Sequence, residues 1–481
     1  MSVNATEPPA SYFHSNFHQA WMYTHITTML MAWIFCMPAA LMLGSRRPTG
    51  SFLAKCFFLL FDATGMVCGV AYRILAPDLY PGNAHQPLAW VVSLVAALWI
   101  VLSIVRSREA GSGKDGKMCD VSVMSTVNGD YLEHGRERNG AGSLELYGYQ
   151  DRSCEQSLRG DEDDDRCNKD EDRRLMESPR TTEGWPSGLN AKILGCRIVQ
   201  YVRLILMATV LPLDFAAIVS GLAIWFGIFR SRHIFSGLAH CIKGGIFFFY
   251  GLLTFARYLG AFADVGWAWN VRPAHSTGHS RKGVVPSAEF TESFVICAYG
   301  ASNVFLEHLN ATRWMHVDLE HVSITVLFFG GGLLGMVLES SWVKRDSTSP
   351  PSNPLPALTI LLLGAMMSMH HQSSHLSAAL HAQWGTLLCG FAFARAATYI
   401  LLHVSLVSDF PGKPFTEVVA AFCLVLGGLL MMLSARDCVE AMDGFGLESM
   451  TVSAIGAGVV ALVLAWEATV IGLRRCGSQS S

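Results

Sequence analysis

Long apolar runs separated by short polar segments dominate the chain. The run at 90–105, WVVSLVAALWIVLSIV, has no charged residue, and neither does the run at 324–338, ITVLFFGGGLLGMVL. Apolar runs of about 20 residues cross a bilayer as helices, because a helix satisfies its own backbone hydrogen bonds in lipid. The pattern therefore predicts an all-α polytopic membrane protein built as a bundle of transmembrane helices.

The apolar runs predict about eleven spans of membrane-crossing length. We expect them at 24–44, 52–75, 87–106, 198–226, 236–262, 289–309, 318–342, 356–371, 381–407, 415–435 and 450–473. The fourth run contains Pro212. Since proline removes a helix hydrogen bond and kinks or breaks the helix, this run forms either one kinked span or a tight hairpin.

Composition agrees with a membrane protein. Only 15% of the 481 residues are charged and 51% are hydrophobic, whereas soluble domains carry about 25% charged residues. Much of the charge lies between the third and fourth spans, where DEDDDRCNKDEDRR occupies 161–174. Such a segment cannot bury enough apolar surface to fold. We therefore expect three parts: an amino-terminal three-span domain at 1–106, a disordered charged cytosolic loop at 107–192, and a carboxy-terminal membrane domain at 193–476.

The expected partners follow from this division. The spans contact the lipid bilayer, and the acidic loop is either a solvated linker or a segment that recruits cytosolic proteins. No nucleic-acid partner and no catalytic residue are predicted.

Basic residues beside the spans predict the orientation, because cytosolic segments carry an excess of Lys and Arg. With eleven spans most of them fall on one side: Arg46, Arg47, Lys55, Arg106, Arg108, Arg272, Arg281, Lys282, Lys344, Arg345, Lys413, Arg474 and Arg475. The amino terminus is then lumenal or extracellular and the carboxy terminus cytosolic, in an endomembrane or the plasma membrane. The glycosylation sequons at Asn4 and Asn310 fall on the non-cytosolic side, as glycosylation requires.

Histidines gather at the same, non-cytosolic ends of the predicted spans. The stretch MMSMHHQSSHLSAALHAQWG at 366–385 holds four of them, and further ones lie at the same level: His25, His85, His240, His308, His316 and His321. One interpretation is that interfacial side chains simply reach water there. The other is a shared metal or haem site, since imidazole suits zinc, copper and iron and polar residues at membrane depth mark function.

Carboxylates beside two of the histidines select the candidate metal ligands. Glu307 precedes His308, and Glu320 precedes His321, so each could orient an imidazole. We predict that His308, His321, His371 and His381 bind a divalent metal. His240 is set aside, because the charge of Lys243 on the same helix face would repel a metal ion.

Several stretches then resemble a known family. GLAHCIKGGIFFFYGLLTFARYLGAFADVGWAWNVRP at 237–273 and ESFVICAYGASNVFLEHL at 292–309 resemble the carboxy-terminal domain of the fungal Ytp-like (yeast transmembrane protein) family, as does DLEHVSITVLFFGGGLLGMVLES at 318–340. HITTMLMAW and YPGNAHQPLAW resemble the family's amino-terminal domain of unknown function. The resemblance implies a multipass membrane protein.

A second similarity, to ascorbate-dependent cytochrome b proteins, concerns His25 with LMAWIFCMP and His85 with NAH. It implies that His25 and His85 hold a haem b. The second predicted span has no histidine, so this is the one ligand pair in the first domain.

These features leave three hypotheses open. The first is a redox or metal-handling membrane protein that binds haem or metal ions through its histidines. The second is a non-enzymatic transporter or scaffold without bound metal. The third is an intramembrane zinc hydrolase that activates water at the second histidine set, although no HExxH signature occurs.

Overall fold

The structure is a computed structural model of the chain. It describes residues 11–44, 48–111, 187–231, 233–262, 267–268, 286–308, 316–340, 343, 353–369, 372, 374–405 and 414–476. The described parts are helical with no strand, which confirms the all-α fold class. The helices are α1 (Gln19–Leu30), the π-helical η1 (Met31–Cys36), α2 (Met37–Leu43), α3 (Pro48–Leu75), α4 (His85–Gly111), α5 (Ser187–Phe226), α6 (His233–Tyr258), α7 (Ala288–His308), α8 (His316–Glu339), α9 (Leu355–Ser368), α10 (His375–Ser405), α11 (Thr416–Leu433), α12 (Arg436–Gly444) and α13 (Ser449–Cys476).

Each of the eleven expected spans corresponds to a helix, but α7, at the expected span 289–309, and α9 are not among the described helices that are long and apolar enough to cross a membrane. Within the described residues nine helical segments are long and apolar enough to cross a membrane. Helix α9 has 14 residues and is about 21 Å long at 1.5 Å per residue, which is shorter than a hydrocarbon core of about 30 Å. Helix α5 continues through Pro212 from Ser187 to Phe226, so the fourth run is one helix rather than a hairpin. Helices α4 and α5 extend into the predicted loop at 107–111 and 187–192, and residues 112–186 lie outside the described part.

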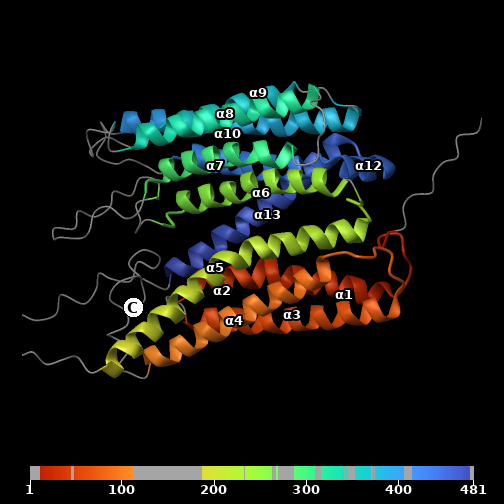
Figure 1. Cartoon of the computed structure of the whole chain (residues 1–481), viewed down its shortest axis with the longest axis vertical. Coiled ribbons are helices and arrows are strands. Elements are labelled where there is room, and N and C mark those ends of the chain that lie inside the picture. Colours follow the sequence, from red (N-terminus) through yellow and green to blue (C-terminus); the bar gives the residue numbers. More distant parts are fainter. Residues whose placement is uncertain are drawn as a thin grey trace, which may run out of the picture.

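The amino-terminal bundle consists of α1 to α5, which lie together in the lower half of Figure 1. The first span is made of α1, η1 and α2, and Pro38 lies in the first turn of α2. The core of this bundle contains Trp33, Phe58 and Trp99, all buried. The ring of Phe58 meets the ring of Trp33 edge-on, with centroids 4.9 Å apart, as aromatic pairs prefer.

The carboxy-terminal bundle is built around α11. Helix α11 packs against α6, α10 and α13, while α7 pairs with α8 and α9 pairs with α10. The backbones of α6 and α11 touch at glycines: a Cβ on Gly428 would lie 2.5 Å from the carbonyl oxygen of Gly244. Small residues that let helices approach this closely are typical of membrane helix packing.

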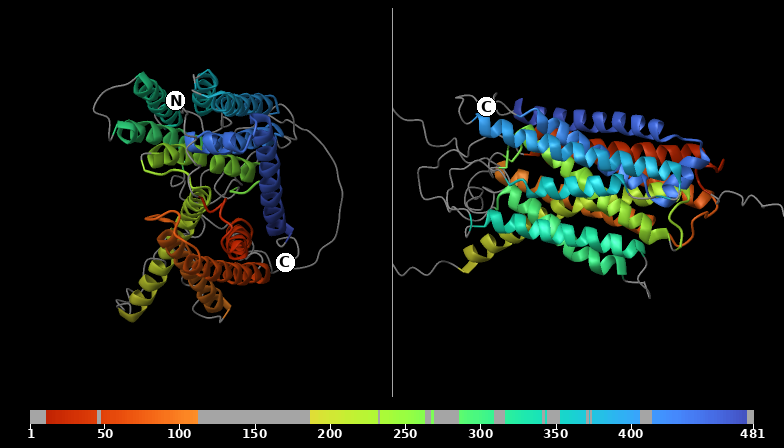
Figure 2. Two further views of the ribbon diagram at one scale, coloured as in Figure 1. Left: turned by 90° about the vertical axis from the view of Figure 1, so that its right-hand side faces the viewer. Right: turned by 90° about the horizontal axis from the view of Figure 1, so that it is seen from above.

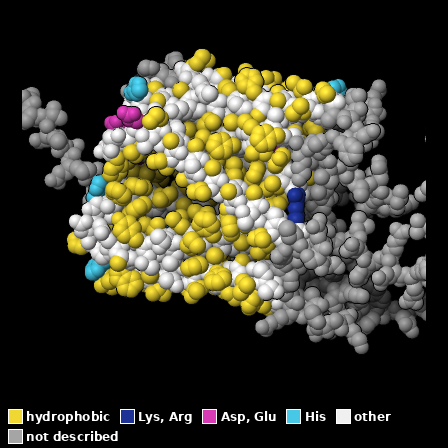
Figure 3. Space-filling model, turned by 180° about the vertical axis from the view of Figure 1, so that it is seen from behind, with side chains coloured by type: hydrophobic (Ala, Val, Ile, Leu, Met, Phe, Trp, Pro, Cys, Tyr) yellow, Lys and Arg dark blue, Asp and Glu magenta, His cyan; other side chains and the backbone are white. Residues whose placement is uncertain are grey.

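Helix α13 joins the two bundles. Its Val470 packs with Ala39 and Leu43 of α2, and α13 also contacts α11. Figure 2 shows α13 passing from one bundle to the other. Large apolar side chains cover much of the outer face in Figure 3, and the histidines visible in that view lie mostly along one edge, opposite the basic side chain at the other. The apolar exterior is the surface that the bilayer covers.

Candidate functional site

The two histidines predicted to share a haem lie side by side at one end of the amino-terminal bundle. His25 is in α1 and His85 is the first residue of α4. Their ring centroids are 6.3 Å apart and the ring planes are 81° to each other. The structure therefore brings together the pair that the sequence analysis selected, while their role as ligands stays a prediction.

Each ring is held through its Nδ1 atom. Nδ1 of His25 lies 2.7 Å from the carbonyl oxygen of Gly65 in α3, and Nδ1 of His85 lies 3.1 Å from Oγ of Ser220 in α5. A carbonyl oxygen only accepts, so Nδ1 of His25 carries the proton and Nε2 keeps the lone pair. Histidines that bind metals are commonly oriented in this way by the nitrogen that does not bind.

Two glycines make room for the two imidazoles. A Cβ on Gly69 would lie 2.9 Å from Nδ1 of His25, and a Cβ on Gly221 would lie 3.0 Å from Cε1 of His85. A larger residue at either position would displace a ring. The sequence analysis missed both glycines, because their relation to the histidines depends on how α1 faces α3 and how α4 faces α5.

A cavity of about 540 Å³ opens beside the two rings. Cofactor and ligand cavities usually measure about 300–1,000 Å³. The lining is largely apolar and aromatic, and it includes Trp33, Trp90 and Trp225. Arg73, an exposed residue, also lines it. The cavity thus offers an apolar body with a basic group that could pair with an anionic end of a ligand.

Two buried carboxylates lie deeper in the same bundle. Asp214 is buried and lines the cavity. Asp62 accepts hydrogen bonds from Nε1 of Trp33 at 3.1 Å and from Oγ of Ser93 at 3.0 Å. Trp33 and Ser93 themselves line the cavity, so the polar floor is built from three different helices.

The four residues predicted to bind a metal are only partly described. The side chains of His308 and His321 and the whole of His371 lie outside the described residues. His381 is buried in α10, with Nδ1 2.8 Å from the carbonyl oxygen of Ser377. The convergence of the four on one metal ion therefore stays a prediction.

His240 lies next to His381, although we had set it aside. The two ring centroids are 6.4 Å apart, and Nδ1 of His240 is 2.9 Å from the carbonyl oxygen of Ser236. Both residues were visible in the sequence at the same predicted level, which was the available signal. Within the described part of the chain, no three His, Cys, Asp or Glu side chains form a metal-binding group.

Contacts between loops and α12 cover the same end of the molecule. Oδ1 of Asp437 in α12 lies 2.6 Å from Nδ1 of His233, and its Oδ2 accepts the N–H of Phe229 at 2.7 Å. The guanidinium of Arg230 lies over the ring of Tyr80, 4.6 Å from its centroid. Burial raises the pKa of the Tyr80 phenol, and the nearby Arg230 charge opposes that shift. The loop after α3 is therefore tied to the loop after α5.

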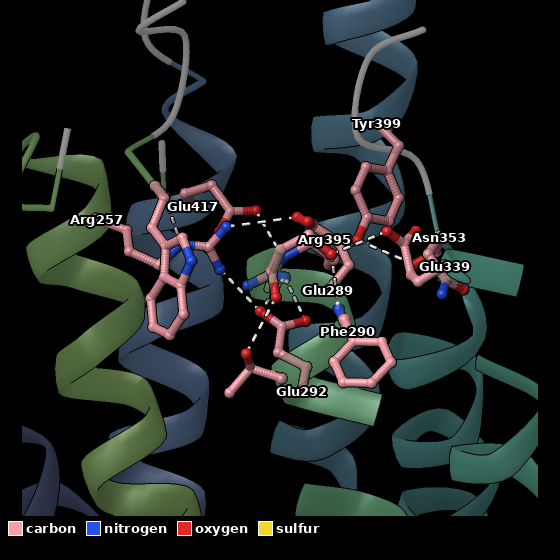
Figure 4. Close-up of polar contacts among 12 residues, drawn as sticks. Arg257, Glu289, Phe290, Glu292, Glu339, Asn353, Arg395, Tyr399 and Glu417 are labelled. Atoms are coloured by element: carbon pink, nitrogen blue, oxygen red, sulfur yellow. Dashed lines mark hydrogen bonds and ion pairs between the residues drawn. The ribbon is translucent and has the colours of Figure 1, made fainter. Parts of the chain in front are cut away.

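A cluster of buried charged residues lies toward the other end of the carboxy-terminal bundle. We call it the buried charge cluster; its members are Arg257, Glu289, Glu292, Arg395 and Glu417, and each is at most 9% exposed. Figure 4 shows these side chains between α6, α7, α10 and α11. The sequence analysis could see each charge within an apolar segment but could not tell that the five meet.

Comparisons with known proteins concern almost the whole chain. The family model for the carboxy-terminal domain of YTP1-like proteins matches residues 213–475, and a domain of unknown function (DUF2427) matches residues 6–109. An uncharacterised membrane protein of Schizosaccharomyces pombe is 30% identical over 94% of each chain. In Saccharomyces cerevisiae, an uncharacterised membrane protein is 37% identical over 53% of this chain and 44% of its own, and protein YTP1 is 28% identical over 43% and 40%. No solved structure matches.

Proposed function

Since the chain belongs to the YTP1-like family of membrane proteins, we propose that its amino-terminal bundle binds haem b between His25 and His85 and takes part in a membrane redox reaction. The observation that carries the proposal is the pair of imidazoles beside a cavity of cofactor size.

The distance between the rings fits two ligands of one iron. Two imidazoles bound to opposite sides of a metal have ring centres about 6 Å apart, because each bond is about 2 Å long and each ring centre lies about 1 Å beyond the nitrogen. The observed separation is 6.3 Å. The polar contacts of His25 with Gly65 and of His85 with Ser220 use Nδ1, so Nε2 is the atom that would bind iron.

Haem suits a two-histidine site better than a metal ion bound by protein alone. The porphyrin supplies four of the iron's ligands, and the protein adds axial ones such as histidine. A zinc site requires three or four protein ligands, and no such group occurs among the described residues. Haem would supply one-electron chemistry at this position. Arg73 at the cavity would pair with its carboxylates, and the tryptophans would exclude water from the ring.

Absorption spectroscopy of the detergent-purified full chain tests the proposal. We expect a Soret band after reconstitution with haemin, with a stoichiometry of one haem per chain. His25→Ala and His85→Ala should each abolish or shift the bands, while His403→Ala, an exposed residue at the far end of α10, should leave them unchanged. The proposal fails if wild-type protein takes up no haem, or if both cavity variants keep the wild-type spectrum.

We propose the orientation and the partners along with this function. The histidine-bearing ends are lumenal or extracellular, the carboxy terminus is cytosolic, and the segment 107–192 recruits cytosolic proteins. The basic residues beside the spans support this orientation. Protease protection of tags at either terminus in sealed vesicles tests it, and a carboxy-terminal tag that is digested only in vesicles with the cytosolic face outward is the expected result.

A further inference from the structure

The buried charge cluster joins four helices of the carboxy-terminal bundle near their ends. Arg257 is in the last turn of α6 and Glu289 in the first turn of α7. Arg395 belongs to α10, and Glu417 is the second residue of α11. His240 and Arg257 are 17 positions apart on α6, about 26 Å at 1.5 Å per residue. The cluster is therefore a separate feature from the histidine pairs.

Glu292 is the best-paired carboxylate of the cluster. Nη1 of Arg257 donates to its Oε1 at 2.7 Å. Nη1 of Arg395 lies 3.5 Å from Oε1 and 3.4 Å from Oε2. Two guanidiniums therefore make charge-assisted contacts with this single carboxylate.

Glu417 pairs with the remaining side of Arg395. Nε of Arg395 is 2.9 Å from Oε1 of Glu417, and Glu417 is fully buried. Next to this pair, the hydroxyls of Thr398 and Thr416 are 2.6 Å apart. Arg395 thus connects Glu417 of α11 to Glu292 of α7.

Glu289 has the longest ion-pair distance of the three carboxylates, although neither carboxylate oxygen of Glu417 has a hydrogen-bond partner among the described residues. The contact to Arg257 is 3.5 Å from Nη2 to Oε1, at the outer limit of a hydrogen bond. The other face of Arg257 is used by the backbone, since its Nε donates to the carbonyl oxygen of Trp267 at 2.7 Å. In Figure 4 Glu289 lies beside Arg395 and Glu292.

The charges of the cluster do not balance within the described residues. Three buried carboxylates face two guanidiniums, which leaves one negative charge if all five groups are ionised. Among the described residues next to the cluster, Tyr250 and Tyr399 add no cation, and Glu339 of α8, which accepts the hydroxyl of Ser287 at 2.9 Å, is another carboxylate. An uncompensated charge in a low-dielectric interior is expensive, and such groups neutralise by taking up a proton.

We propose that the buried charge cluster is a proton-binding site and that Glu289 carries the proton at neutral pH. The neutral acid leaves Arg257 and Arg395 balanced by Glu292 and Glu417 across α6, α7, α10 and α11. If Glu289 loses the proton, its carboxylate competes with Glu292 for the guanidinium of Arg257. Proton release would thereby loosen the link between α6 and α7, which is the coupling that a proton-driven transporter or gate requires.

Infrared spectroscopy of the full-length protein in detergent tests the proposal, because a protonated carboxylic acid has a carbonyl stretch that an ionised carboxylate lacks. We expect a band from one buried acid, sensitive to deuterium exchange, which disappears in Glu289→Gln. Glu440→Gln, which changes an exposed carboxylate of α12, serves as the control and should leave the band unchanged.

The competing outcomes are distinct. Absence of any buried protonated acid overturns the proposal, and loss of the band in Glu292→Gln or Glu417→Gln but not in Glu289→Gln overturns the assignment to Glu289. A second readout does not depend on band assignment. The melting temperature of wild-type protein should fall between about pH 6 and about pH 8, since the unfolded chain releases the proton that the folded state keeps. Glu289→Gln should weaken this pH dependence, and an equal slope in the two proteins counts against the proposal.

Discussion

Replacing Gly69 with alanine should displace His25. The new Cβ would lie 2.9 Å from Nδ1 and 3.0 Å from Cε1, whereas ordinary contacts begin at 3.4 Å. The imidazole must therefore move by about 0.5 Å, the difference between 3.4 and 2.9 Å. The movement strains the 2.7 Å contact from Nδ1 to the carbonyl oxygen of Gly65.

The size of the effect combines opposing contributions to the free energy of unfolding. Overpacking costs about 1–3 kcal/mol, and a lost hydrogen bond costs about 1 kcal/mol. Alanine in place of a helical glycine gains about 1 kcal/mol. We therefore expect Gly69→Ala to destabilise the fold by about 1–3 kcal/mol, and to weaken haem binding about 10–100-fold, as changes to groups that orient a ligand commonly do.

The assay compares Gly69→Ala with Gly458→Ala by thermal unfolding and haemin titration. Gly458 lies in α13, where a Cβ would meet nothing within 4 Å, so this control has only the propensity gain. Gly221→Ala should behave like Gly69→Ala through His85. If Gly69→Ala binds haem as tightly as Gly458→Ala does, then the position of the His25 ring is irrelevant to haem binding and the reasoning is wrong.

Three further predictions concern other parts of the chain. Gly428→Ala should lower the melting temperature relative to Gly458→Ala. The new Cβ at 428 would lie 2.5 Å from the carbonyl oxygen of Gly244 and 2.6 Å from the backbone nitrogen of Phe248. Equal melting temperatures of the two variants would contradict the close packing of α6 on α11. Burial, with Cys241 and Asp437 nearby, raises the pKa of the Cys438 thiol to about 12. The thiol of folded protein should therefore be alkylated slowly at about pH 8 and about tenfold faster per added pH unit. Peptide mass spectrometry, with unfolded protein as the reference, measures the labelling rate, and rapid labelling at about pH 8 would refute the prediction. Asn4→Gln should abolish a glycosidase-sensitive gel shift if the amino terminus is lumenal or extracellular, and a shift that survives in the variant would assign the glycan to another site.

Helix content was predictable because each span is a long apolar run. Even α5, which contains Pro212, continues as one helix, since membrane helices tolerate proline when neighbouring groups satisfy the freed backbone atoms. The short helix α12 was not predicted. It has nine residues, RDCVEAMDG, with two pairs of apolar residues on either side of Glu440, and such a length gives little periodic signal.

The sequence predicted at which level of the membrane the site residues lie, but not toward which neighbouring helix each side chain faces. His25 and His85 were placed at one level by their positions at the starts of spans, and a second resemblance selected them as a pair. The contact of His240 with His381 and the glycines behind His25 and His85 depend on helix rotation. Helix rotation is set by packing against neighbouring helices, which one sequence does not reveal.

The proposed haem site and the buried charge cluster belong to different bundles, and the contacts between the bundles indicate how far the two could influence each other. Helix α13 touches α11, which carries Glu417, and it packs on α2 through Val470, Ala39 and Leu43. This second contact is apolar, and Met42 and Trp466 pack around it. Phe215 of α5 also meets Phe249 of α6, with ring centroids 5.3 Å apart. A change of charge in the cluster could therefore reach the amino-terminal bundle through a shift of α13 or of α6. Coupling between distant sites requires an element with two arrangements that both sites bias. If α13 and α6 each have one arrangement, Glu289→Gln changes the pH dependence of unfolding and leaves haem affinity at its wild-type value. A haem affinity that changes with Glu289→Gln would show that α13 or α6 links the two bundles.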